Sequence, residues 1–239
     1  MAQVKSAAPA RGGRIVILVA ALAAALLTAR LGWWQWDRAA QKLALQTTLD
    51  SRAGLPVVGA AELVADGRDE LYYRRVKLRG RWLVGQTVYL DNRQMNARPG
   101  FIVVTPLQWA GAAVLVQRGW VARDSDARTH LPVLDTPAGE VEVVGRVAPP
   151  PGRLYEFSAA ASGAIRQNID PTAYSREIGL TLLPLSVLQE DASAADGLLR
   201  QWPAPAVDIH KHYGYAFQWW AMSALITGLY VWFQVLRPR

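Results

Sequence analysis

Two long apolar stretches lie near the two ends of the chain, and the residues between them follow a different pattern. The first covers residues 15–36 and ends in a cluster of tryptophans. The second covers residues 216–236, where polar side chains are few. A bilayer core of roughly 30 Å is crossed by about 20 apolar helical residues. The pattern therefore predicts two transmembrane helices.

The first stretch also has the basic start and apolar core of a cleaved signal peptide. Two features are against cleavage. Trp33, Trp34 and Trp36 are suited to a membrane–water interface, and no clear site with small residues precedes them. We therefore predict that the first stretch is retained as an anchor.

A helix is expected to continue beyond the first apolar stretch. Residues 37–45 are rich in alanine, leucine, lysine and glutamine, which favour helices. Residues 51–54 end in a glycine and Pro56 follows shortly after, so the helix should end there.

The central part of the chain contains short runs of aliphatic and β-branched residues. They lie at residues 74–83, 87–90, 101–104, 114–116 and 141–144. Glycine and asparagine residues punctuate these runs and predict turns between strands, among them Gly80, Asn92, Gly100, Gly119 and Gly145. Short strands at regular spacing favour an antiparallel sheet, as a sandwich or small barrel. The predicted fold class is a membrane-anchored α+β protein, in which N- and C-terminal transmembrane helices flank a mainly antiparallel β domain.

One short helix and one further strand are predicted later in this domain. Asp170 has the side chain of an N-cap, Pro171 suits the first helical turn, and Gly179 supplies a C-terminal stop. Residues 180–185 then predict a strand with an edge or bulge proline. The acidic, alanine-rich residues 189–197 predict an exposed loop.

These patterns divide the chain into five segments. A basic tail (1–14) precedes the first transmembrane helix (15–36), and the mainly-β domain follows (37–211). The second transmembrane helix with its interfacial start (212–236) leads to a short tail (237–239).

Positive charge is concentrated in the two tails. Residues 1–14 carry three basic side chains and no acid, and residues 237–239 carry two arginines. Of the total charge of +7, residues 15–236 therefore hold only +2. Basic tails favour the cytoplasmic side of a membrane, so we predict cytoplasmic termini and a β domain on the other side. The central domain lacks the basic excess typical of nucleic-acid binding, and the predicted partner is the lipid bilayer.

The sequence carries few signals of enzymatic chemistry. It has no cysteine, which excludes disulfides, thiolate catalysis and covalent c-type haem attachment. No nucleophile elbow, phosphate loop, dinucleotide fingerprint or His-Glu-x-x-His motif occurs. A membrane-tethered hydrolase would need a Ser-His-Asp site at His130, which lies in a predicted loop. We therefore predict that the chain is not an enzyme.

The other two histidines lie just before the second apolar stretch. In a helix, His210 and His212 point to nearly opposite faces and cannot chelate one metal ion. His212 aligns instead with Tyr215 and Trp219 along the membrane helix. Two interpretations stay open, an interfacial histidine without a ligand or an imidazole that ligates a haem iron. From the pattern alone the first is favoured.

A haem at this position would need basic partners for its propionates. Arg30, Arg38 and Lys42 lie near the end of the first apolar stretch, and each can form charge-assisted hydrogen bonds.

A series of short motifs runs in order along the chain. Leu31-Gly32-Trp33-Trp34-Gln35-Trp36-Asp37-Arg38 closes the first apolar stretch. Asp91-Asn92-Arg93, then Gln117-Arg118-Gly119-Trp120-Val121, then Gly145-Arg146-Val147 follow in the central domain. His212-Tyr213-Gly214-Tyr215-Ala216-Phe217-Gln218-Trp219-Trp220 opens the second stretch. In this order, between two membrane anchors, the motifs resemble those of the surfeit-locus (Shy-type) cytochrome oxidase assembly factors.

The resemblance implies an assembly factor of the bacterial inner membrane for haem-copper cytochrome c oxidase, with a periplasmic β domain. Such a factor holds or delivers haem a to the catalytic subunit, its implied partner alongside the haem a synthesis machinery. The family's haem-binding histidine falls on His212, and Arg38, Lys42, Tyr215 and Trp219 are the expected haem contacts. The alternative is a scaffold that stabilises the unassembled oxidase subunit without haem.

For the other matched residues we expect structural roles. Gly80, Gly100 and Gly119 permit turns or close backbone approach. Arg93 and Arg118 can fix loops through hydrogen bonds to carbonyls or carboxylates.

Overall fold

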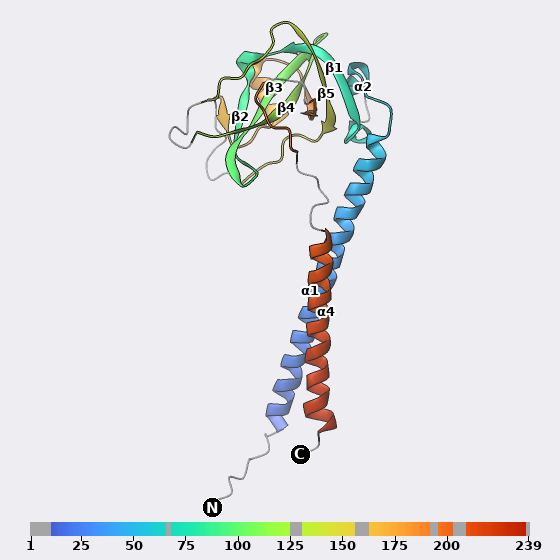
Figure 1. Cartoon of the computed structure of the whole chain (residues 1–239). Helices are drawn as coiled ribbons and strands as arrows, with labels where there is room; N and C mark the ends of the chain where they lie inside the picture. Colours follow the sequence, from blue (N-terminus) through green and yellow to red (C-terminus); the bar gives the residue numbers. More distant parts are fainter. Residues whose placement is uncertain are drawn as a thin grey trace, which may run out of the picture. The chain divides into compact units, whose positions relative to one another are not determined.

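The structure is a computed structural model that describes residues 11–65, 68–124, 131–155, 163–191, 196–202 and 209–237. The chain divides into two compact units (Figure 1). One comprises Met1–Thr47 and Ala204–Arg239 and is a helix pair, and the other comprises Thr48–Pro203 and is a β domain.

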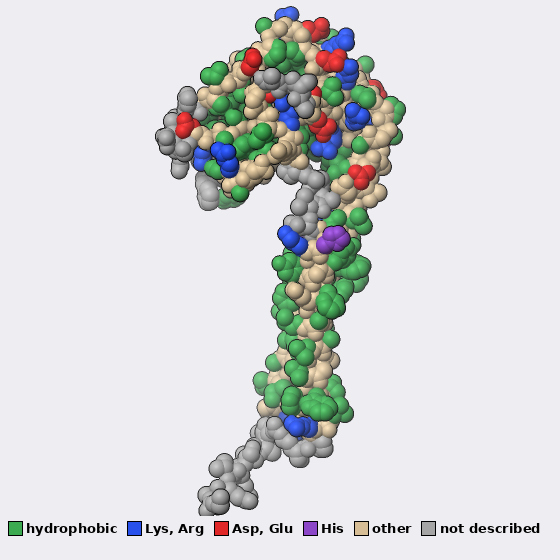
Figure 2. All heavy atoms as spheres, in the orientation of Figure 1, with side chains coloured by type: hydrophobic (Ala, Val, Ile, Leu, Met, Phe, Trp, Pro, Cys, Tyr) green, Lys and Arg blue, Asp and Glu red, His purple; other side chains and the backbone are tan. Residues whose placement is uncertain are grey.

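The first unit consists of one long helix and most of another, whose residues from Thr48 onward belong to the second unit. Helix α1 spans Arg11–Ala53, and α4 spans Ile209–Val231 and continues as a π-helical turn, η3, over Trp232–Leu236. Both are long and apolar enough to cross a membrane, and hydrophobic side chains cover much of their surface in Figure 2. The predicted end of the first helix at residues 51–54 is confirmed.

Buried and half-buried side chains repeat along α4 with the spacing of a coiled coil. They include His212, Ala216, Trp219, Ser223, Ile226 and Tyr230, at alternating steps of four and three residues. This repeat is typical of a helix that packs along a partner helix. The corresponding stripe of α1 contains Ala21, Ala25, Thr28, Gly32 and Gln35, so it consists of small residues up to Gln35. Small residues let two membrane helices approach closely.

The second unit is a sheet that closes into a barrel-like ring. Its strands are β1 Arg75–Trp82, β2 Val88–Met95, β3 Arg98–Trp109, β4 Ala112–Ala122, β5 Glu140–Ala148, β6 Ile165–Arg166 and β7 Leu182–Gln189. They pair in the order β1-β5-β7-β4-β3-β2-β6, and an additional β1–β3 pairing closes the ring. Only β4–β7 and β2–β6 are parallel among the pairs of the described strands. The predicted fold class is confirmed, in its barrel-like form.

Short helical segments lie before the first strand and between later strands. They are α2 Ala60–Val64, the 3₁₀ turns η1 Arg68–Leu71 and η2 Val84–Gln86, and α3 Pro171–Ile178.

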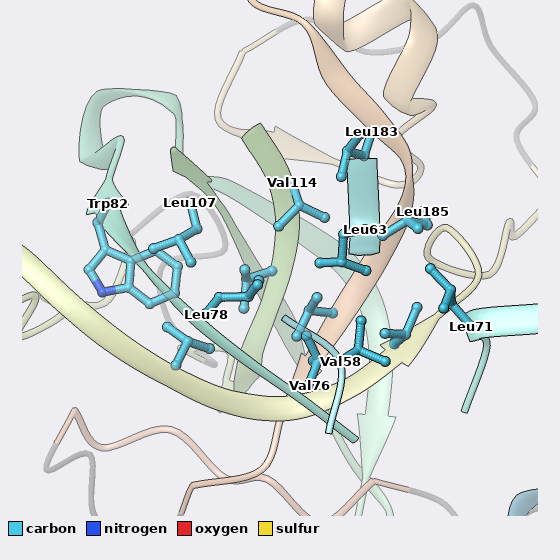
Figure 3. Close-up of a cluster of buried hydrophobic side chains, with 14 residues drawn as sticks. Val58, Leu63, Leu71, Val76, Leu78, Trp82, Leu107, Val114, Leu183 and Leu185 are labelled. Atoms are coloured by element: carbon cyan, nitrogen blue, oxygen red, sulfur yellow. The ribbon is translucent and has the colours of Figure 1, made fainter. Parts of the chain in front are cut away.

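Aliphatic side chains from several strands fill the barrel. Every second residue of β1 from Val76 to Trp82 is buried, as the period of two in a strand requires. Figure 3 shows Val76 and Leu78 converging with Leu107, Val114 and other side chains of the same buried cluster. Leu63 of α2 joins this cluster, so the short helix is held by the same core.

The helix α3 has the caps that the sequence predicts. The Asp170 carboxylate accepts a hydrogen bond from the Ala173 N–H at 2.8 Å, and Gly179 adopts a left-handed φ of 67°. Tyr174 packs into a second core cluster, and its hydroxyl donates to the Gln86 carbonyl at 2.7 Å. The predicted bulge in the following strand is also confirmed, because the β4–β7 register shifts around Pro184.

Five residues predicted to separate strands lie inside strands instead. They are Gly80, Asn92, Gly100, Gly119 and Gly145. A side chain at Gly80 or Gly145 would collide with a backbone carbonyl of a neighbouring segment, that of Gln108 or Leu188. Glycine marks such sites of close backbone approach in small barrels. The predicted turns at these positions are therefore wrong, whereas the expected close approach at Gly80, Gly100 and Gly119 is confirmed.

Candidate functional site

Side chains of α4 contact the backbone of α1. Ser223 Oγ donates to the Ala25 carbonyl at 2.9 Å, and Trp220 Nε1 donates to the Ala29 carbonyl at 3.3 Å. A Cβ at Gly32 would collide with the Trp220 indole, so this glycine permits the close approach of the two helices. Successive contacts move forward along α1 and backward along α4, which makes the pair antiparallel (Figure 1).

His212 lies on the same stripe of α4 and faces Gln35 of α1. The His212 Nδ1 atom is 2.7 Å from Gln35 Oε1. Because a carbonyl oxygen accepts hydrogen bonds, this contact places the imidazole proton on Nδ1 and leaves the Nε2 lone pair available. Nε2 has no hydrogen-bond partner among the described residues. A hydrogen bond on one ring nitrogen is the usual way in which proteins fix an imidazole that ligates a metal through the other.

An aromatic cluster lies one residue beyond each member of this pair. The Trp36 ring centroid is 5.1 Å from that of Tyr213 in an edge-on arrangement and 5.8 Å from that of Trp220. Aromatic pairs at such distances add about 0.5–1.5 kcal/mol each beyond the area they bury. Trp36, which the sequence places at a membrane–water interface, therefore also holds the two helices together beside His212, as does Trp220.

The two basic residues predicted to contact haem, Arg38 and Lys42, lie on α1, one and two turns beyond Gln35. Arg38 is exposed, and its guanidinium lies 5.6 Å from the Trp34 ring centroid and donates to Gln41 Oε1 at 3.4 Å. Lys42 is half-buried on the same stripe as Gln35.

The two aromatic residues predicted to contact haem lie on α4. Tyr215 is half exposed one turn from His212, and Trp219 is half-buried two turns from it. No hydrogen bond joins either residue to His212. The structure thus joins His212 directly to Gln35, which the sequence analysis did not single out.

The remaining histidines do not contribute to this pair. His210 is exposed on α4, on a different face from His212 as predicted. His130 lies outside the described residues. Within the described part of the chain, no three His, Asp or Glu side chains are grouped closely enough to hold a metal ion.

A second polar centre is buried in the β domain around Arg118 of β4. The Arg118 guanidinium pairs with Asp196 at 3.3 Å, donates to Thr136 Oγ1 at 2.7 Å and lies over the Trp82 ring. Arg200 shares the same Asp196 carboxylate. This centre joins loops to the barrel wall, which confirms the structural role expected of Arg118. It also shows that residues 189–197 are not simply an exposed loop, because Gln189 and Asp196 are buried at its two ends.

Comparison with known proteins places the chain in a family. A family model for the SURF1 family matches residues 22–224. The chain belongs to the SURF1 family. The resemblance to the surfeit-locus assembly factors is thereby confirmed, and the matched range includes both Gln35 and His212.

Several curated SURF1 relatives match over much of the chain. A SURF1-like protein of Rickettsia bellii is 26% identical over 207 residues, which cover 84% of this chain and 83% of the relative. A SURF1-like protein of Drosophila melanogaster is 25% identical over 227 residues, 87% of this chain and 74% of the relative. The cytochrome oxidase assembly protein SHY1 of Saccharomyces cerevisiae is 28% identical over 148 residues, 59% of this chain and 38% of the yeast protein.

Proposed function

We propose that this SURF1-family chain takes part in the assembly of cytochrome c oxidase and that its helix pair holds haem a for the catalytic subunit. The assembly role is supported by family membership and by the similarity to the yeast assembly protein. The haem-holding role is supported by one observation, the imidazole of His212 that is fixed through Nδ1 and open at Nε2. In this role the chain binds and hands over a group and catalyses no reaction.

The residues around His212 fit an apolar group with charged edges. When bound, haem supplies the redox-active iron porphyrin that the oxidase requires. His212 Nε2 would bind the iron, while Tyr215 and Trp219 on α4 would provide apolar and aromatic surface. Arg38, exposed on α1, can reach an acidic propionate edge by a charge-assisted hydrogen bond, as can the Lys42 ammonium. A single protein ligand favours release to an acceptor, which a donor requires.

The proposal also includes a subcellular location and a membrane topology. The chain would cross the bacterial inner membrane twice, through α1 and α4, with both termini in the cytoplasm and the β domain in the periplasm. The length and apolar character of the two helices support the crossings, and the basic tails support the orientation.

Replacing His212 with alanine is expected to weaken haem retention at least about tenfold, because it removes the iron ligand. The measurement is the reduced-minus-oxidised absorbance spectrum of the detergent-purified full chain, isolated from cells that synthesise haem a. His210→Ala is the matched control, since His210 is exposed on a different face of the same helix, and it should keep the wild-type spectrum.

The alternative function, a scaffold for the unassembled oxidase subunit, gives a different result in the same experiment. Neither the wild type nor the variants would carry haem, while the catalytic subunit would still co-purify with all of them. That result would remove His212 from the proposal and leave the assembly role.

Gln35 is expected to act as a positioning residue for His212. Gln35→Leu removes the acceptor for Nδ1–H, makes the imidazole a weaker donor to iron and should lower haem retention about tenfold. Gln35→Glu keeps an acceptor and adds charge, so the two variants should shift the haem midpoint potential in opposite directions, upward for leucine and downward for glutamate. Redox titration of the bound haem measures this, and shifts of equal sign would contradict the positioning role.

A further inference from the structure

A second candidate site lies wholly within the β domain, in a cavity of about 540 Å³ beside the β2–β3 hairpin. Apolar side chains form much of its wall, including Ile102, Trp120, Leu154 and Trp202. The polar side chains that line it are amides and one guanidinium, that of Arg93. Among the described residues no carboxylate lines this cavity, so it has an apolar body and a single positive charge.

Arg93 reaches the cavity because β2 is irregular at this point. The pairing of β2 with β3 shifts register between Leu90 and Arg93, and Asn92 adopts a left-handed φ of 59°. Irregularities of this kind re-aim the side chain that follows them and are common beside functional sites. Trp120 Nε1 donates to the Arg93 carbonyl at 2.9 Å and so fixes the backbone of the irregular segment.

The positive charge of Arg93 is poorly compensated. Its Nη2 donates to the Gln167 carbonyl at 2.9 Å, whereas Nε is buried with no partner among the described residues. Asp91, two residues away, pairs with Arg123 instead at 3.3 Å. Burial lowers the pKa of Arg93, and no acidic group among the described residues offsets this. Arg93 is half-buried, and even partial burial of a guanidinium without a counter-ion is costly, so an anionic ligand would reduce that cost.

The walls of the cavity are held in place before any ligand binds. Asn96 Nδ2 donates to Gln201 Oε1 at 2.8 Å, which fastens the chain after β7 to the hairpin. Trp202 Nε1 donates to the Gln189 carbonyl at 2.8 Å. Asn168 exchanges two hydrogen bonds with the backbone of Leu154. A preformed wall lowers the entropy cost of ordering that binding would otherwise carry.

We propose that this cavity binds a carboxylate carried on an apolar body. The carboxylate lies against the planar fork of Arg93, whose geometry matches two carboxylate oxygens. The apolar body lies against Trp120 and Trp202. A small organic acid and the C-terminal carboxylate of a peptide present this same chemistry.

The test uses the full chain in nanodiscs of zwitterionic lipid, with empty nanodiscs to subtract partitioning of the probe. The probe is 4-(trifluoromethyl)phenylacetate, observed by ¹⁹F NMR, and its uncharged amide is the matched ligand. Wild-type protein should bind the acid at least about tenfold more tightly than the amide, since hydrogen bonds to charged groups are the stronger ones. Arg93→Gln should abolish this preference, and Arg93→Lys should keep part of it because it keeps the charge.

Two controls separate the site from general effects. Arg98→Gln makes the same charge change at an exposed position of the neighbouring strand that does not line the cavity, and should bind as the wild type does. Trp202→Ala should weaken acid and amide alike, because it removes apolar wall and no charge. A peptide ending in leucine, used as free acid and as amide, competes with the probe if the site takes a chain terminus.

The proposal is overturned if wild-type protein binds acid and amide equally or shows no saturable binding. It is also overturned if Arg93→Gln, shown by circular dichroism to be folded, keeps the preference for the acid. Competition by the peptide acid would identify a chain terminus as the source of the carboxylate, and its failure beside successful probe binding would identify a small organic acid.

Discussion

Replacing Asp196 with alanine is expected to destabilise the β domain by about 3–5 kcal/mol. The Asp196 carboxylate accepts hydrogen bonds from Arg118 Nη2 at 3.3 Å and from Arg200 Nη2 at 2.5 Å. The side chains of both arginines are less than a tenth exposed. Burial lowers the pKa of Arg118, whereas the charge of Asp196 acts in the opposite direction. Without Asp196, the Arg118 guanidinium would keep no acidic partner among the described residues, and Arg200 would keep only Asp191, 3.9 Å from its Nε.

Urea unfolding of the full chain in detergent, followed by the far-ultraviolet circular dichroism of the sheet, measures this change in the free energy of unfolding. The double variant Asp196→Ala with Arg118→Met should recover part of the loss, because it removes one of the uncompensated charges. Arg79→Ala, which breaks an exposed ion pair between Arg79 of β1 and Glu142 of β5, should leave the unfolding midpoint unchanged. A loss below about 1 kcal/mol for Asp196→Ala would mean that the buried pair does not hold the loops to the barrel.

The elements that could be predicted from the sequence are those fixed by local chemistry. The caps of α3 are an example, since Asp170 and Gly179 act on backbone groups within a few residues of themselves. The buried strand β1 is another, because its alternation is set by the two faces of a strand. The presence of a long helix near each end of the chain follows in the same way from the apolar stretches.

Features that depend on segments far apart in the sequence could not be predicted. Gly145 was expected to mark a turn, but it lies in β5 because the Leu188 carbonyl of β7 approaches its Cα. The sequence predicts that Asp196 lies in an exposed loop, because no residue near it in sequence indicates that Arg118 lies opposite. The sequence signal for this pair is the composition of β4, since Arg118 is a lone arginine in an apolar strand and needs an acidic partner elsewhere.

The candidate site on the helix pair also has one residue that local sequence indicates and one that depends on a distant segment. His212 is a candidate because it precedes an apolar helix and because the resemblance places the family's haem-binding histidine there, and its stripe follows from the helical period. Gln35 was overlooked among its tryptophan neighbours, although it is 2.7 Å from His212. Its partner depends on the antiparallel register of α1 and α4, which no single helix contains. A polar side chain within an aromatic cluster is the sequence signal that could have indicated it.

Replacing Gly32 with leucine is expected to separate α1 from α4, at a cost of about 1–3 kcal/mol from overpacking. The new side chain would occupy the space of the Trp220 indole, which is itself packed against Trp36. Moving Trp220 would also break its hydrogen bond to the Ala29 carbonyl. Since Gln35 lies one turn beyond Gly32, the same displacement should lengthen the Gln35–His212 contact and reduce haem retention.

The absence of cysteine makes the separation of the helices measurable by cross-linking. The register set by the Ser223–Ala25 contact places Ala21 near Ile226, and both are half-buried. A variant with cysteine at these two positions should form its disulfide readily in the parent and several-fold more slowly after Gly32→Leu. Gly228→Leu is the matched control, since a side chain there meets open space, and its rate should match the parent. Equal rates of disulfide formation in all three proteins would show that the packing of the two helices does not depend on the close approach at Gly32. The position of His212 would then be independent of the packing at Gly32.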